Sequence, residues 1–254
     1  MSESRGLNVM NACQAAMTAV GYDDADSLRQ IMEKYPEVKA IGCDDGHGNK
    51  LTLIQWASIL VKVKSLACLA LAGCDIHEAL RSATSLSPDR ENTPLAGAIM
   101  SQSPIARRAM FDSLMLSPLT DAERDGAGWK RAMHAAVYVG DAYIMSSLRA
   151  RLGDAGRLLW PMPSNQHGNT LFHLAAGEGG LESLPLLLDW DELQGLAEQP
   201  NGRGMSPRQV AELCKNSKFC EELDARLTSR REAAELSELV EARSSAKSAL
   251  GRRI

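Results

Sequence analysis

Histidines and cysteines are the residues of this chain whose side chains could most readily take part in chemistry. Cys74, Asp75 and His77 are close in sequence and carry sulfur, oxygen and nitrogen atoms that bind metals. A zinc site needs about four ligands, usually supplied as two spaced pairs, and no second pair follows here. Two further pairs of cysteines have a spacing unlike the C-x-x-C of zinc and redox sites. These cysteine pairs are Cys68 with Cys74 and Cys214 with Cys220. We therefore predict no metal site.

The spacing motifs of three common enzyme classes are absent from the sequence. It contains no Gly-x-Ser-x-Gly for acyl transfer, no Gly-x-x-x-x-Gly-Lys-Ser/Thr for nucleotide phosphates and no His-Glu-x-x-His for zinc proteolysis. Gly202-x-Gly204 alone is too short to indicate a dinucleotide site. Catalytic groups distant in sequence could still meet in the fold, so an enzyme with an unrecognised site stays a minor alternative. The main prediction is a protein that is not an enzyme and has no cofactor.

Composition favours a helical protein. Hydrophobic residues make up 44% of the chain, charged residues 24% and aromatic residues only 4%, which suits thin helix-on-helix interfaces better than a β-sandwich. The formal net charge of −4 gives no general attraction for phosphate backbones, so we predict no nucleic-acid partner.

Neither a secretory signal nor a membrane span is predicted. The segment from Met1 to Asn11 lacks a basic start and an apolar run, and the longest apolar stretch, near residues 51–61, is far shorter than the ~20 residues that cross a bilayer. The scattered cysteines are interpreted as reduced thiols. We expect a cytoplasmic protein, or one delivered into a host cell by a specialised secretion system.

A repeated pattern is clearest between Gly168 and Leu188. The segment reads Gly-Asn-Thr-Leu-Phe-His-Leu-Ala-Ala-Gly-Glu-Gly-Gly-Leu-Glu-Ser-Leu-Pro-Leu-Leu-Leu. It resembles the ankyrin repeat, whose signature is T-P-L-H-x-A followed by a glycine turn and a leucine-rich second helix. Thr170, His173 and Ala175 match the signature, and Leu171 replaces its proline.

The same spacing recurs along the chain. Other copies contain Thr52 and Ala57, Thr93-Pro94 and Ala98, His134 and Ala136, and Ser206-Pro207 and Ala211; the positions equivalent to the signature histidine are 55, 96, 134, 173 and 209, with a weaker first copy near Ala15. These positions are 36 to 41 residues apart, more than the usual 33, so we expect long loops at residues 42–49, 82–92, 117–128 and 161–168.

The predicted fold class is all-α, an ankyrin-repeat solenoid of about six helical-hairpin repeats with a C-terminal capping helix. We place an N-terminal extension at residues 1–11, the ankyrin-repeat domain at 12–227, and a C-terminal helix with a flexible basic tail at 228–254. The capping part should reach about Val240, and residues 243–254 should be disordered. Pro185 should make the second helix of its repeat start late or kink.

The resemblance also implies roles for particular residues. His134 and His173 would be neutral, mostly buried rings that hydrogen-bond to the backbone of an adjacent loop. Ligands of ankyrin repeats bind to loop tips and to the exposed side of the first helices, a concave groove. Tyr138 and Arg203 are our first candidates for contact residues, because Tyr and Arg are frequent at energetic hot spots. The predicted groove residues are Tyr138, Val139, Gly177 and Glu178, and the predicted finger-loop residues are Asp44, Asp45, His47, Gln166, His167, Asn169, Asn201 and Arg203.

These observations predict a non-catalytic module that binds another protein, as an effector or adaptor. Two alternatives stay open: an inhibitor or immunity protein that occludes a toxin or enzyme, and a purely structural self-assembling protein. We expect no nucleic acid and no membrane as partner, and a monomer when the chain is alone.

Overall fold

The computed structural model describes residues 2–44, 50–78, 93–118, 126–161, 167–178, 180–193 and 195–251. Within these ranges the chain is all-α, as predicted, apart from two short antiparallel strands, β1 (Cys43–Asp44) and β2 (Lys50–Leu51). Most of each long loop expected from the sequence lies outside the described residues. No helix in the described ranges is long and apolar enough to cross a membrane.

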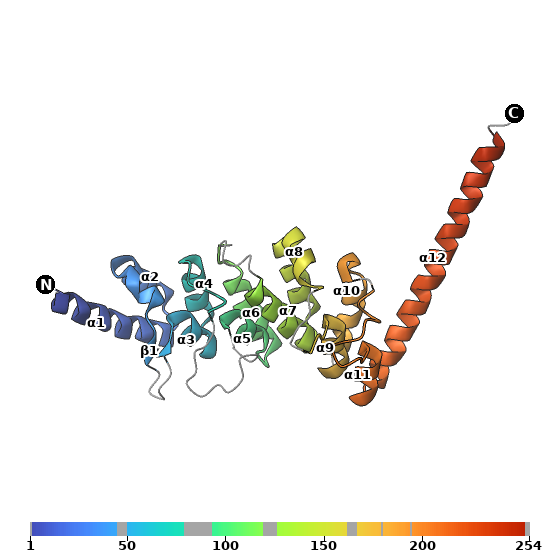
Figure 1. The fold of residues 1–254 in the computed structure, drawn as a ribbon. Helices are drawn as coiled ribbons and strands as arrows, with labels where there is room; N and C mark the ends of the chain where they lie inside the picture. The colour runs from blue at the N-terminus through green and yellow to red at the C-terminus, as the bar shows by residue number, and fades with distance from the viewer. Residues whose placement is uncertain are drawn as a thin grey trace.

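The helices follow one another as six consecutive pairs, and Figure 1 shows the pairs side by side in an elongated stack. In the described ranges they are accompanied by turns of 3-10 helix at η1 (Pro36–Ala40), η4 (Gly180–Ser183) and η5 (Asp191–Leu193). The pairs are α1 (Ser2–Gly21) with α2 (Ala25–Lys34), α3 (Leu53–Ile59) with α4 (Val63–Leu71), α5 (Pro94–Ile99) with α6 (Pro104–Leu114), α7 (Ala127–Val139) with α8 (Ala142–Leu159), α9 (Leu171–Glu178) with α10 (Leu184–Leu188), and α11 (Pro207–Leu213) with α12 (Ser217–Gly251).

The first helix of each pair contacts the first helix of the next. Helices α1, α3, α5, α7, α9 and α11 touch in this order, while α2, α4 and α6 form a second layer behind them. The alanines two residues after each signature position are fully buried, and their small side chains allow this close approach. A continuous core therefore runs through the stack, and each pair buries its apolar face on its neighbours. These alanines are Ala57, Ala98, Ala136 and Ala175.

Hydroxyl side chains cap the start of several helices. The Thr93 oxygen accepts a hydrogen bond from the backbone N–H of Ala96 at 3.2 Å, and Ser206 does the same for Gln209 at 3.3 Å. Both bonds satisfy an N–H group that the first helical turn leaves without a partner. A proline follows each of these capping residues, at the first position of the helix. The backbone N–H that proline lacks would have no hydrogen-bond partner within the helix at this position.

The late start of the fifth pair's second helix is confirmed. A 3-10 turn, η4, occupies Gly180–Ser183, and α10 begins at Leu184, so Pro185 lies in the first turn of the helix. There its ring avoids the clash that it would cause in a helix interior.

The two ends of the chain are both helical. Residues 2–11, expected to be an extension before the repeats, form the first half of α1. At the other end α12 contacts the stack only as far as Leu227 and Arg231, and the residues up to Val240 do not cap it. The helix continues to Gly251, through residues where disorder was predicted.

Candidate protein-binding surface

His173 links two adjacent helix pairs, as predicted for the signature histidine. Its Nδ1 accepts a hydrogen bond from the Thr170 backbone N–H at 3.1 Å, and its Nε2 donates to the Met205 carbonyl oxygen at 2.9 Å. Met205 lies in the loop before α11, so one buried ring fastens α9 to the next pair. Burial lowers the pKa of His173, which keeps the ring neutral and leaves Nδ1 able to accept.

Gln55 makes the same link three pairs earlier. Its Oε1 accepts from the Thr52 backbone N–H at 2.9 Å, and its Nε2 donates to the Glu78 carbonyl oxygen at 3.1 Å. Glutamine and histidine at this position therefore serve the same structural purpose: each accepts from the helix start and donates to a loop that precedes the next pair.

His134 only partly follows the prediction. It is mostly buried in α7, and burial lowers its pKa to about 4, so the ring is neutral. Its Nε2, however, is buried without a hydrogen-bond partner, and the predicted bond from this atom to an adjacent loop is not present.

Four predicted finger residues come together in two neighbouring loops. The Asn201 side-chain amide donates to Asn169 Oδ1 at 2.7 Å, and the Gly202 backbone N–H donates to the His167 carbonyl oxygen at 2.7 Å. Asn201 Oδ1 also accepts from the backbone N–H of Arg203 at 2.9 Å. The asparagines thus hold the loops to each other, whereas Arg203 is exposed and its guanidinium lies 3.3 Å from His167 Nε2.

The other predicted contact residues are only partly testable. Asp45, His47 and Gln166 lie outside the described residues, and only the backbone is described at Asp44 in β1 and Glu178 in α9. At the end of α7, Tyr138 is exposed, but Val139 is half-buried and packs against the core. Gly177 faces Val210 of α11, and a Cβ added at residue 177 would lie 3.8 Å from the Val210 side chain.

Large apolar side chains occupy the position of Tyr138 in three other pairs. Each lies four residues after the position of the signature histidine, at the end of the first helix, and the exposed fractions are 53% for Ile59, 43% for Met100, 43% for Tyr138 and 73% for Leu213. Because these helices contact one another in order, the four side chains form an interrupted row along the stack, with Gly177 in the fifth pair. We call Ile59, Met100, Tyr138 and Leu213 the apolar stripe.

Of the four stripe residues, only Tyr138 was among the predicted groove residues. Tyr138 lies two residues before Gly140, the turn glycine of its pair, whereas the second, third and sixth pairs have no glycine at the equivalent position. The fixed distance from the signature position was the signal that would have found Ile59, Met100 and Leu213.

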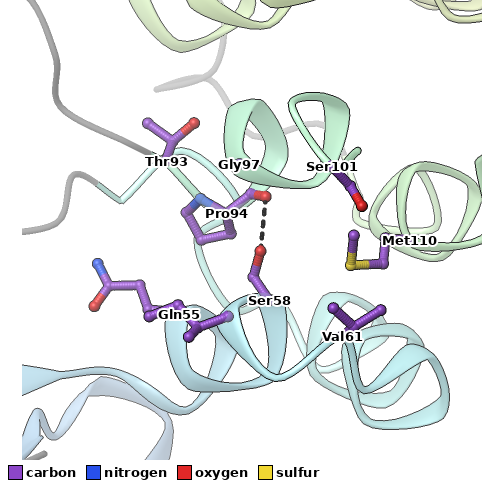
Figure 2. Close-up of a pocket in the computed structure, with 9 residues that line it drawn as sticks. Gln55, Ser58, Val61, Thr93, Pro94, Gly97, Ser101 and Met110 are labelled. Atoms are coloured by element: carbon purple, nitrogen blue, oxygen red, sulfur yellow. Dashed lines mark hydrogen bonds between the residues drawn. The ribbon is translucent and has the colours of Figure 1, made fainter. Parts of the chain in front are cut away.

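A shallow pocket of about 240 Å³ opens beside the stripe between α3 and α5. Ile59 and Val61 line one side and Gly97 and Met110 the other, as Figure 2 shows for the last three. The Ser58 hydroxyl donates to the Pro94 carbonyl oxygen at 3.1 Å across the floor of this pocket.

Val61 has a strained backbone beside this pocket. Its φ of 57° lies in the left-handed region, where a β-branched side chain is rare. The equivalent residue of the fourth pair is Gly140, with φ 68°. The chain therefore keeps an exposed apolar side chain at a turn that glycine would fit without strain.

Most of the described histidines and cysteines, the residues that could do chemistry, are buried or half-buried, and Cys214 is exposed. The His77 ring packs edge-on against Trp129 with 4.6 Å between ring centroids, and burial lowers its pKa to about 4. Burial raises the pKa of Cys43 and Cys74 to about 11, which keeps both thiols protonated and weakly nucleophilic. Among the described residues, no group of three or more His, Cys, Asp or Glu could hold a metal ion.

No protein-family model matches this chain, and a search of curated proteins gives no match either. The residues and their geometry are therefore the basis of the functional argument.

Proposed function

We propose that this chain is a divergent ankyrin-repeat protein and that it binds another protein without catalysing a reaction. The equivalent bonds of Gln55 and His173 support the repeat assignment, because two different side chains bridge successive pairs in one way. The order of helix contacts supports it as well.

The apolar stripe is the observation that carries the binding proposal. Single exposed apolar residues are common on protein surfaces, but here large apolar side chains recur at one position in four of the helix pairs, and a row of exposed apolar side chains is typical of an interaction site. Tyr138 provides the large, rigid aromatic side chain that is frequent at hot spots. Arg203, on the finger loops, would add a polar contact at the edge of the interface.

The test compares stripe residues with matched exposed residues elsewhere. Tagged protein carrying Met100→Glu and Tyr138→Glu is used for affinity capture from a lysate of the source organism, beside the unchanged chain. The control carries Ile105→Glu and Leu71→Glu, which place the same charge on exposed apolar positions of α6 and α4. We expect the stripe variant to lose the captured protein and the control to retain it.

Circular dichroism of each variant checks that the helices are intact. Equal capture by the stripe variant and the unchanged chain would refute binding through the stripe. Arg203→Ala, tested in the same way, reports on the finger loops. If this variant captured as much of the partner protein as the unchanged chain, Arg203 would not be part of the interface.

The alternative of an inhibitor or immunity protein uses the same surface. It predicts that the captured protein has an activity of its own that falls to zero at a one-to-one ratio with this chain. An adaptor or effector would leave that activity measurable in the complex. The proposed compartment is the cytoplasm, or a host cell reached through a specialised secretion system.

A further inference from the structure

The pocket between α3 and α5 borders the apolar stripe directly, because Ile59 belongs to both. The described residues that line it include no charged side chain. At about 240 Å³ it is smaller than the pockets of roughly 300–1,000 Å³ that hold small-molecule ligands. Its size and its place therefore suit a single side chain of a protein that covers the stripe. We call it the stripe pocket.

Three of the four polar side chains that line the stripe pocket already use their polar atoms within the chain. The Ser58 hydroxyl donates to the Pro94 carbonyl oxygen, as Figure 2 shows, and the Thr93 oxygen accepts from the first turn of α5. Both ends of the Gln55 amide are bonded as well, which leaves the Ser101 hydroxyl. A charged group that entered the pocket would lose its water without gaining a charged partner, whereas an apolar group would gain contacts.

Gly97 keeps the stripe pocket open and destabilises its own helix. It lies inside α5 (Pro94–Ile99), where glycine is less favourable than every residue except proline. A Cβ added there would meet only the Ser58 Oγ, at the ordinary contact distance of 3.8 Å. Neither close packing nor a positive φ therefore requires glycine at residue 97. What its missing side chain does is leave space in the pocket that it lines.

Val61 is unfavourable for the fold at the same pocket. Its left-handed backbone is shared by the equivalent residues Gly140 and Lys215, neither of which is branched at Cβ. Because Val61 is 44% exposed, burial does not explain why a valine is present there. Two lining residues, Gly97 and Val61, thus differ from what the fold alone favours, and such departures are typical of functional sites.

We propose that the stripe pocket receives one uncharged apolar side chain, the size of leucine or phenylalanine, from the protein that covers the apolar stripe. The inference rests on the function proposed above and adds the chemistry of the group that the partner presents. Because Ile59 is shared, one partner can cover the stripe and insert this side chain. A side chain held in a desolvated pocket is typical of an energetic hot spot.

The first test titrates the full chain with N-acetylated amino-acid amides and follows the methyl signal of Met110, which lines the stripe pocket, by NMR. We expect the leucine and phenylalanine amides to bind with a dissociation constant of about 1–10 mM, and the lysine and glutamate amides at least about tenfold more weakly. Gly97→Leu should fill the pocket and weaken binding by about tenfold or more. The control, Ala150→Leu, adds the same side chain at an exposed position of α8 and should leave binding unchanged.

A second variant, Val61→Asn, separates binding from folding. Asparagine tolerates the left-handed conformation, so the melting temperature should stay the same or rise. Its polar side chain should nevertheless weaken binding of the leucine amide by about threefold or more. Equal binding of the leucine and lysine amides, or an affinity for the leucine amide that neither Gly97→Leu nor Val61→Asn changes, would overturn the proposal.

Affinity capture with the same variants separates this inference from the proposed function. Gly97→Leu should lose the captured protein, and Ala150→Leu should retain it. If Gly97→Leu captured as much protein as the unchanged chain while the stripe variant captured none, the inference would fail and the proposed function would stand. If the unchanged chain captured no protein, the proposed function itself would fail, even where the leucine amide binds.

Discussion

Single side chains connect the helix pairs of this protein, and the bonds they make are few but buried. His173 and Gln55 each satisfy one backbone N–H and one backbone carbonyl in different segments. A buried bond of this kind contributes modestly when it is made, but its loss leaves two polar groups without partners.

Replacing His173 with alanine should therefore lower the free energy of unfolding by about 1–3 kcal/mol. His173→Gln should lower it less, because Gln55 shows that a glutamine side chain can make the equivalent pair of bonds. Urea denaturation of the two variants measures the difference. Equal losses for alanine and glutamine would show that the hydrogen bonds of the ring are not what stabilises this position.

Two buried imidazoles make stability depend on pH. Burial lowers the pKa of both His77 and His134 to about 4, below the ordinary value of 6.5. Between these values the unfolded chain binds protons that the folded chain does not, so the free energy of unfolding falls as the pH drops from 6.5 toward 4. Above pH 6.5 both states are neutral at these positions and the effect vanishes.

At pH 5 the loss should be about 2 kcal/mol for each histidine relative to pH 7.5. His77→Phe keeps a ring against Trp129 but cannot titrate, so its stability should fall less between the two pH values. Chemical denaturation at both pH values measures this difference. The same fall in the variant and in the unchanged chain would show that His77 does not titrate with unfolding.

At the scale of elements, close backbone approach fixes where two helices can lie. A Cβ added at Gly180 in η4 would lie 2.6 Å from the Val137 carbonyl oxygen and 3.0 Å from the Ala175 Cα. The turn before α10 can thus contact both α7 and α9 only because residue 180 has no side chain. Ser183, at the end of the same turn, donates a hydrogen bond to that Val137 oxygen at 3.0 Å.

Gly180→Ala should destabilise the protein by about 1–3 kcal/mol, since backbone must move to make room for the methyl group. Gly177→Ala is the matched control. There the nearest atom to the added Cβ is 3.8 Å away, an ordinary contact, and alanine favours the helix by up to about 1 kcal/mol. In thermal unfolding, Gly180→Ala should melt below the unchanged chain and Gly177→Ala at or above it. If Gly180→Ala melted as high as Gly177→Ala, the close approach at Gly180 would be contradicted.

The features that follow from local rules could be predicted from the sequence. The helix starts at Thr93 and Ser206 and the late start caused by Pro185 depend on neighbouring residues alone. His173 was also predictable, because its bonds are fixed by its place in the repeat. The unpartnered Nε2 of His134 was not, since it depends on whether a carbonyl from another loop reaches that atom.

The end of α12 was wrongly predicted for a similar reason. Leu236, Leu239 and Val240 have the spacing of a helix that covers a core. Periodicity shows that a face is apolar but not whether any surface is left for it to cover. Here Phe219 and Leu223 are already buried in the core at the end of the stack, and the side chains from Glu232 to Glu241 lie beyond it and are exposed.

At the scale of the whole molecule, the two parts of α12 should affect stability very differently. Deletion of residues 232–254 should leave thermal unfolding almost unchanged, because the side chains from 232 to 241 are exposed. Deletion of residues 217–254 also removes Phe219 and Leu223 and should destabilise the protein by several kcal/mol, about 3–5 kcal/mol for the loss of one buried aromatic alone. Similar stability of the two shortened chains would contradict the assignment of the first part as the cap.

The helix contacts that run from each pair to the next also determine how the molecule should respond to mechanical force. A pull on its two ends would load the interfaces in series, so the interface with the lowest strength would open first while the others stayed closed. In an optical trap, the end-to-end length of the chain should increase in a series of small steps as single interfaces open. It should decrease again when the force is lowered and the pairs re-form, which is the response of a soft spring.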